Sequence, residues 1–165
     1  MTPPATPRRS GVVLLALVLV AVNLRAALTS VPSVVLDIQR STGWGDIALG
    51  LLTTLPVVAM GLFALAVPSI AARVGRSRAV WGALALLTLA LVVRLAGTVP
   101  GVLHVSVIAA GIGIALISGL VPGIVREQLP GAIGSATGAW TAAMFLGAGA
   151  AAALTVPIAV LTGSW

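Results

Sequence analysis

Residues 11–28 read GVVLLALVLVAVNLRAAL: an unbroken apolar run from Gly11 to Val22 is followed by Arg25, after which the apolar sequence resumes. Such a run predicts a membrane-spanning helix, because about 20 helical residues cross a hydrocarbon core of about 30 Å. An arginine inside a spanning helix costs roughly 2.5–3.5 kcal/mol on insertion scales, so the charge usually faces a protein interior or a wet cavity instead of lipid. Arg25 is therefore the first pointer to a function.

The composition extends this conclusion to the whole chain. Of the 165 residues, 59% are hydrophobic and 7% are charged, which is typical of an integral membrane protein. The net charge of +6 comes from nine arginines that punctuate apolar runs. They do not form the basic face with interleaved aromatic residues that a nucleic-acid reader needs, so we expect no nucleic-acid partner. The chain has no cysteine, and a lone His104 cannot build a zinc site, so we expect no metal and no cofactor.

Apolar stretches of spanning length divide the chain into five predicted transmembrane helices. Turn residues such as Pro130 and Gly131 agree with these divisions, and the short connections require neighbouring helices to pack antiparallel. The expected fold is an all-α membrane protein with a cytoplasmic disordered tail, residues 1–10, and one transmembrane helical bundle, residues 11–165. The expected spans are 11–31, 47–71, 79–95, 102–121 and 136–161.

The arginines also predict the orientation, since short cytoplasmic loops carry an excess of positive charge. They precede the first span and recur in every second connection, at Arg8, Arg9, Arg73, Arg76, Arg78 and Arg126. We therefore expect a multi-pass protein of the plasma membrane with its amino terminus in the cytoplasm. A cleaved signal peptide at the amino terminus is the alternative, and the four further spans disfavour it. Five spans place the other terminus outside, where a turn into another helix is expected, which predicts a truncated piece of a larger protein.

The loop after the second span has a diagnostic pattern. Arg73, Gly75 and Arg76 match the first arginine, the following glycine and the next arginine of the pattern Gly-x-x-x-Asp-Arg-x-Gly-Arg-Arg. In this the loop resembles the signature of the major facilitator superfamily, which implies a gating role. A plain excess of cytoplasmic arginine explains the same residues equally well. The loop departs from the signature at Pro68, Ala72 and Ser77, and the loss of the acid removes the family's charged latch to neighbouring helix ends.

Three further stretches resemble one branch of that superfamily, the cyanate and nitroimidazole transporters. They are NLRAALTSV at 23–31, GLLTTLPV at 50–57 and GAWTAAM at 138–144. The resemblance implies a transporter of twelve helices, of which the chain supplies about five at the amino-terminal end. Ser118 and Phe145 stand where the branch often has asparagine, and both changes make a cavity less polar.

Arg25 and Asn23 are the leading candidates for substrate binding, and we place both on the cavity side of the first span. Arginine presents forked donors on a fixed cation, which suits a carboxylate or a small inorganic anion. The alternative for Arg25 is a side chain that snorkels to the outer interface, and we expect Arg94 and His104 to be interfacial in that way. Weaker lining candidates are Thr53, Thr54, Thr141 and Met144.

Small residues and prolines predict close packing and kinks. Gly138 and Gly147 lie on or near a stripe of small residues in the fifth span, and such faces let membrane helices approach closely. Pro56 removes a backbone donor near the middle of the second span, beside Thr53 and Thr54, and Pro157 is expected to act likewise in the fifth. Ordinary structural packing is the alternative for each.

These features predict a secondary transporter that moves a small anion or polar organic solute by alternating access. None of the three acids lies within a span core, so the five predicted spans supply no carboxylate for a proton relay. A membrane-embedded serine protease is the rival class, but Ser118 and His104 would lie about 21 Å apart along one helix, and we expect no enzyme. A non-transporting structural subunit, or an inactive transporter fragment, survives better. The expected partners are a small anionic solute, the lipid bilayer and the missing remainder of the transporter.

Overall fold

The computed structural model describes residues 7–95 and 101–162, and within them the chain is helical throughout, with no strand. Five helices are long and apolar enough to cross a membrane: α1 (Pro7–Ser33), α3 (Asp46–Ala64), α5 (Arg76–Arg94), α6 (Val102–Gln128) and α7 (Ile133–Thr162). Two short helices, α2 (Val35–Thr42) and α4 (Val67–Val74), follow α1 and α3. The predicted all-α membrane fold is confirmed.

Some helix ends differ from the expected spans. The stretch expected as one span at 47–71 is divided between α3 and α4, where Pro68 in the first turn of α4 lacks the N–H that a continuous helix needs. Helix α6 runs past Pro122 to Gln128, because a proline inside a long helix removes only one of many backbone bonds. Helix α1 begins at Pro7, so residues 7–10 of the expected tail are helical, and the rest of that tail lies outside the described residues.

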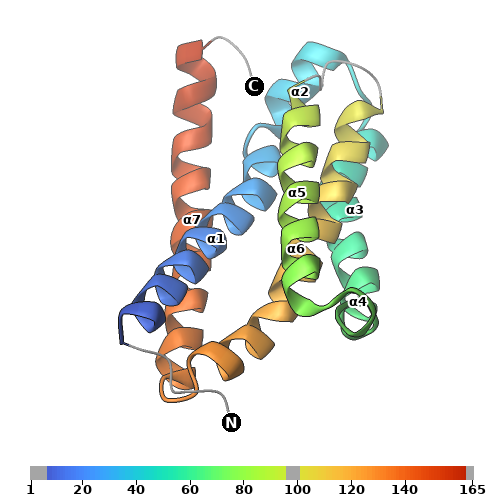
Figure 1. Ribbon diagram of the computed structural model, residues 1–165. Helices are drawn as coiled ribbons and strands as arrows, with labels where there is room; N and C mark the ends of the chain where they lie inside the picture. Colours follow the sequence, from blue (N-terminus) through green and yellow to red (C-terminus); the bar gives the residue numbers. More distant parts are fainter. Residues whose placement is uncertain (1–6, 96–100, 163–165) are drawn as a thin grey trace.

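The long helices form two groups in Figure 1: α6 packs between α3 and α5, and α1 crosses α7 diagonally at one side of the bundle. The largest buried cluster joins the two groups, with members such as Leu24 of α1, Leu87 of α5, Ile114 of α6 and Trp140 of α7. Helix α6 is the most buried span and α7 the least. A second cluster gathers α1, α2, α3 and α6 at the end of the bundle that carries α2.

Two glycines bring backbones into direct contact. A Cβ added at Gly111 of α6 would lie 2.5 Å from the Pro56 carbonyl oxygen of α3. A Cβ added at Gly147 of α7 would lie 2.7 Å from the Cα of Val22 in α1, and nearer still to the Val22 carbonyl oxygen. Real Cβ atoms essentially never come so close. Each contact therefore requires glycine, and each fixes one helix pair at backbone separation.

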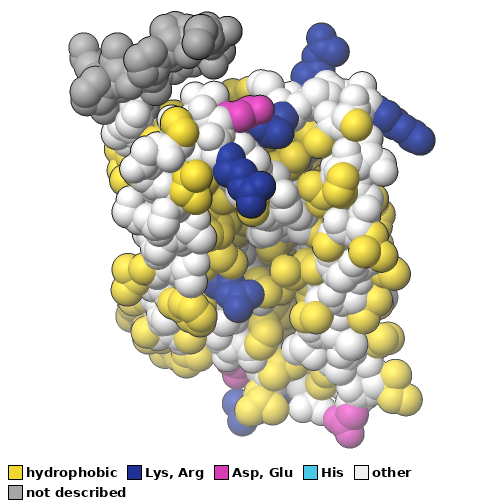
Figure 2. Space-filling model, turned by 90° about the horizontal axis from the view of Figure 1, so that it is seen from below, with side chains coloured by type: hydrophobic (Ala, Val, Ile, Leu, Met, Phe, Trp, Pro, Cys, Tyr) yellow, Lys and Arg dark blue, Asp and Glu magenta, His cyan; other side chains and the backbone are white. Residues whose placement is uncertain are grey.

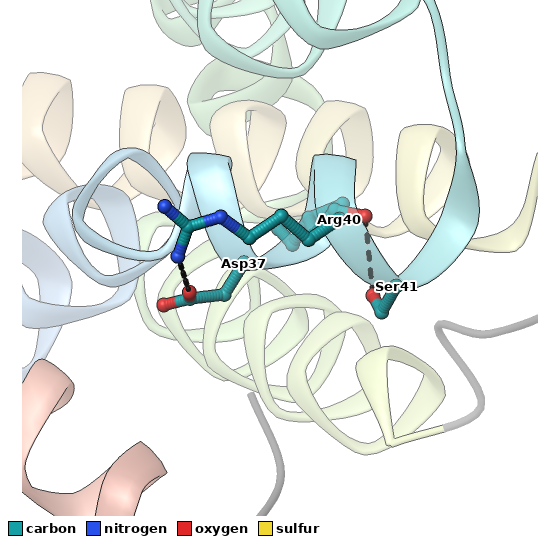
Figure 3. A network of polar contacts seen from close by, with 4 residues as sticks. Asp37, Arg40 and Ser41 are labelled. Carbon is teal, nitrogen blue, oxygen red and sulfur yellow. Dashed lines mark hydrogen bonds and ion pairs between the residues drawn. The ribbon is translucent and has the colours of Figure 1, made fainter.

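The two ends of the bundle carry different charges. Exposed arginines lie at the end that holds α4 and the α6–α7 connection, at Arg73, Arg78 and Arg126, and Figure 2, seen from that end, shows several of these cationic side chains. At the opposite end, α2 holds Asp37 and Arg40, whose carboxylate and guanidinium lie 3.4 Å apart (Figure 3). The start of α1 and the end of α7 lie at opposite ends (Figure 1), as an odd number of spans requires.

Replacing Gly147 by alanine is expected to destabilise the protein by about 1–3 kcal/mol, because the added methyl group overpacks the contact between α1 and α7. The measurement is the melting temperature of the purified protein in detergent. The matched control is Gly149→Ala on the same helix, where an added Cβ meets nothing within 4 Å. Equal melting temperatures for the two variants would contradict a backbone contact at Gly147.

Candidate functional site

A cavity of about 320 Å³ opens among the five long helices on the α2 side of the bundle centre. Its polar lining consists of Arg25 and Thr29 of α1, Thr53 of α3 and Arg94 of α5. The remaining lining is aliphatic apart from Phe145 of α7. The volume lies at the lower end of the range of about 300–1,000 Å³ for ligand pockets, so the cavity suits a small solute.

The Arg25 guanidinium has no partner within the described part of the chain. The residue is partly buried in α1, and the hydrogen bond recorded there is made by its backbone, whose carbonyl oxygen accepts from the Thr29 hydroxyl. An arginine within a spanning helix usually faces the protein interior or a water-filled cavity, and Arg25 lines such a cavity. Arg25 is thus free to bind an acceptor that enters.

Arg94 is held by three hydrogen bonds that join α5 to α1 and α6. Its Nη1 donates to the Ala27 carbonyl oxygen and to Ser30 Oγ of α1, each at 3.1 Å, and its Nε donates to Ser106 Oγ of α6 at 3.4 Å. Ser106 is 1% exposed and donates its own proton to the Ala90 carbonyl oxygen at 2.8 Å. The Arg94 side chain is therefore fixed in place.

No carboxylate lines the cavity. The three acids of the chain lie at the two ends of the bundle: Asp37 pairs with Arg40, the Asp46 carboxylate accepts from Gln39 at 3.2 Å, and Glu127 pairs with Arg76. The cavity therefore brings together two guanidinium groups whose charge no acidic side chain of the described residues neutralises. An anion is the ligand that such a lining favours.

Helix α3 contributes its proline-bearing segment to the cavity wall. Pro56 is buried and lines the cavity with Thr53, one turn earlier. The hydroxyls of Thr53 and Thr54 both donate to the Gly50 carbonyl oxygen, at 2.9 and 2.8 Å. Thr54 is exposed and does not line the cavity, so only one of the two threonines is available to a ligand there.

Asn23 lies away from Arg25, although we expected both on the same side of α1. Two residues along a helix differ by about 200° in direction at 3.6 residues per turn, so neighbours at this spacing face opposite sides. Asn23 is exposed and lines a separate cavity of about 250 Å³ between α1 and α5, together with Thr88. The structure does not bring Asn23 and Arg25 together.

Helix α7 faces the cavity with Phe145, which we expected to make a cavity less polar, and not with the weaker lining candidates Thr141 and Met144. Phe145 and Ala148 line it, whereas Thr141 is exposed and donates to the Thr137 carbonyl oxygen at 3.0 Å. Met144 packs against the large buried cluster. An added Cβ at Gly138 meets nothing within 4 Å, and Pro157 lies exposed within the helix, so packing and kink roles at these two positions remain predictions.

The arginine loop is organised around Gly75, which ends α4 and precedes α5. Its φ of +84° lies in a region that side chains rarely adopt, so the turn requires glycine. Arg76 then reaches α6, where its Nη1 donates to the Gly123 carbonyl oxygen at 3.3 Å and pairs with Glu127. Arg73 in the last turn of α4 is exposed. The loop thus ties α5 to α6, and its role in gating remains a prediction.

Sequence reasoning placed Arg94 at the outer interface and did not name Ser106. The structure places Arg94 between three helices and beside the cavity. The sequence feature that could have indicated this position is a second arginine within an apolar span, with a serine shortly after the following connection. Hydropathy along the sequence predicts that such an arginine lies at a helix end, because the helices that supply its hydrogen-bond partners are distant in sequence.

Comparison with known proteins gives three relatives, each described as a transporter. They are the cyanate transport protein CynX of Escherichia coli, 31% identical over 92% of this chain; the 2-nitroimidazole transporter of Escherichia coli, 29% over 95%; and the uncharacterized transporter YycB of Bacillus subtilis, 29% over 90%. No protein-family model matches the chain, and no solved structure matches it significantly.

The resemblance to the cyanate and nitroimidazole branch of the major facilitator superfamily is confirmed along nearly the whole chain. The chain spans 37–40% of the length of these curated relatives. The similarity therefore covers nearly all of this chain and about two fifths of each relative.

Replacing Ser106 by alanine is expected to lower stability by about 1–3 kcal/mol, because it removes the acceptor of Arg94 Nε in a buried position. The measurement is thermal unfolding of the purified protein. Ser135→Ala is the control, since Ser135 is exposed and donates only to the carbonyl oxygen of Ala132, the residue directly before α7. A Ser106 variant as stable as this control would show that the buried bonds contribute little.

Proposed function

We propose that this chain, a relative of the cyanate and nitroimidazole transporters, is part of a secondary transporter that moves a small anion or a small polar organic solute across the plasma membrane by alternating access. The observation that carries the proposal is the cavity at Arg25, a cation whose guanidinium has no partner among residues 7–95 and 101–162. The transporter names of the three relatives support the general class.

An anion is favoured over a neutral solute by the energetics of the cavity. A guanidinium that has left water and found no acid is costly, and a bound carboxylate or small inorganic anion restores charge-assisted hydrogen bonds. The names of the relatives agree with a small solute of either kind, since one carries the anion cyanate in its name and another the neutral 2-nitroimidazole. Cyanate is accordingly the first anion to try.

Alternating access is supported by the way the helices meet. The cavity lies where α1 and α7 face the group of α3, α5 and α6. Close contact at Gly111 and Gly147 keeps each helix pair together, and the largest buried cluster joins the two groups, so the five helices would move as one unit. The remaining helices of the transporter would close the cavity from the side that these five leave open.

A serine protease is disfavoured by the position of the histidine. His104 Nε2 lies 3.0 Å from the Ala48 carbonyl oxygen, and its ring stacks on Trp44 with 5.2 Å between centroids. These contacts hold His104 at the α2 end of the bundle, one of them using the nitrogen that a general base would need. We propose no enzymatic activity.

Replacing Arg25 by alanine is expected to reduce anion transport at least about tenfold, because one charge-assisted contact is worth roughly 1.5–3 kcal/mol. Arg25→Lys should retain part of the activity, since it keeps the charge but loses the fork. The measurement is uptake of labelled cyanate into vesicles by the full gene product. Arg40→Ala is the matched control, because Arg40 is exposed on α2 and far from the cavity. Unchanged uptake in both Arg25 variants would favour a structural subunit or an inactive fragment.

The proposed orientation puts the arginine-rich end in the cytoplasm. The chain contains no cysteine, so single cysteines at the exposed positions Ser77 and Ser41 report the two sides. In intact cells, a membrane-impermeant thiol reagent is expected to label Ser41→Cys and to spare Ser77→Cys until the membrane is broken. The reverse pattern would invert the proposed topology.

A further inference from the structure

We infer that Arg94 is a second anion contact, so that the cavity recognises its solute with two guanidinium groups. This deepens the proposed function and rests on it. The solute class is then a compact monoanion with at least two acceptor atoms, such as a carboxylate, a small oxyanion or a linear pseudohalide, one end bound at Arg25 and the other at Arg94.

The first argument is the donor count of Arg94. A guanidinium has five N–H groups. Nε and Nη1 account for three of them through Ser106, Ala27 and Ser30. For the two hydrogens of Nη2, no acceptor is found among residues 7–95 and 101–162. Arg94 is thus fixed by one part of its fork and keeps the other part available.

The second argument is that the groups around Arg94 leave its charge intact. Each serine that accepts from Arg94 sends its own proton to the backbone: Ser106 donates to Ala90 and Ser30 donates to Ala27, at 2.8 and 3.3 Å. Both neighbours are therefore neutral dipoles, and no acid stands beside them in the described helices. Charged residues in membranes pair with one another or with backbone carbonyls. Arg94 has partners of the second kind, which position it without neutralising its charge.

The third argument is position. Arg94 lines the main cavity and also a smaller cavity of about 110 Å³ that includes Ser30, Ile38 and Thr155. Ile38 belongs to α2, so the smaller cavity lies nearer the α2 end of the bundle. Arg94 therefore borders the main cavity on its α2 side, where it can contact a solute that is also bound at Arg25.

Two unneutralised cations beside one cavity raise the free energy of the empty site. A bound anion lowers that free energy by interacting with both cations. A neutral isostere relieves neither, so the pair discriminates by charge more than by shape. If Arg94 only held the helices together, its replacement would weaken the binding of charged and neutral solutes equally. That difference separates a binding role from a structural one.

The experiment measures dissociation constants for formate, nitrate, thiocyanate and the neutral formamide, by isothermal titration of the purified full gene product in detergent. For Arg94→Gln we expect at least about tenfold weaker binding of every anion that the unchanged protein binds, with formamide within about twofold. Arg94→Lys keeps a charge but not the fork, and should weaken the anions severalfold. It serves as the test if the glutamine variant does not fold.

Three outcomes overturn the inference. Anion binding within about twofold of the unchanged protein in an Arg94 variant, together with loss of binding in Arg25→Gln, leaves the proposed transporter standing and makes Arg94 structural. Equal weakening of anions and formamide has the same meaning. Failure of the unchanged protein to bind any of the three anions removes the anion site itself and with it this part of the proposed function. Arg40→Gln is the control for a general loss of positive charge.

Discussion

The hydrogen bonds of Arg94 join three helices in a medium that supplies no hydrogen bonds of its own. Within a bilayer, a polar group must find its partners inside the protein, and Arg94 finds them on α1 and α6, through Ala27, Ser30 and Ser106. The contact sets the separation of these helices beside the main cavity. Fold and site therefore depend on the same side chain, which binds to backbone and hydroxyl groups instead of an acid.

Glycine contacts between helix backbones also hold the helices of the bundle together. At Gly111 and Gly147 the backbones of neighbouring helices touch, and dispersion contacts at that separation replace the hydrophobic driving force that is absent in lipid. The largest buried cluster packs between the two helix groups, and the cavity around Arg25 lies beside it. A bundle of this kind holds a cavity open without filling it with larger residues.

The three relatives place this arrangement in a functional setting. Each is described as a transporter, and the chain covers about two fifths of the length of each. Arginine at two positions of one cavity wall, and acids only at the bundle ends, is a charge distribution that suits a carrier of negative solutes.

The sequence alone was sufficient for the class of protein, the number of spans and the likeness to the cyanate and nitroimidazole transporters, because hydrophobicity acts on each segment separately. Arg25 remains a prediction as a binding residue, and the structure places it at the cavity wall. The sequence was not sufficient to predict which other residues line the cavity with Arg25. Asn23 is adjacent in sequence but faces another cavity, since helical rotation separates residues two apart. Arg94 meets Ser30 of α1 and Ser106 of α6 only in the folded bundle, because side chains far apart in sequence are brought together by helix packing, which no local pattern encodes.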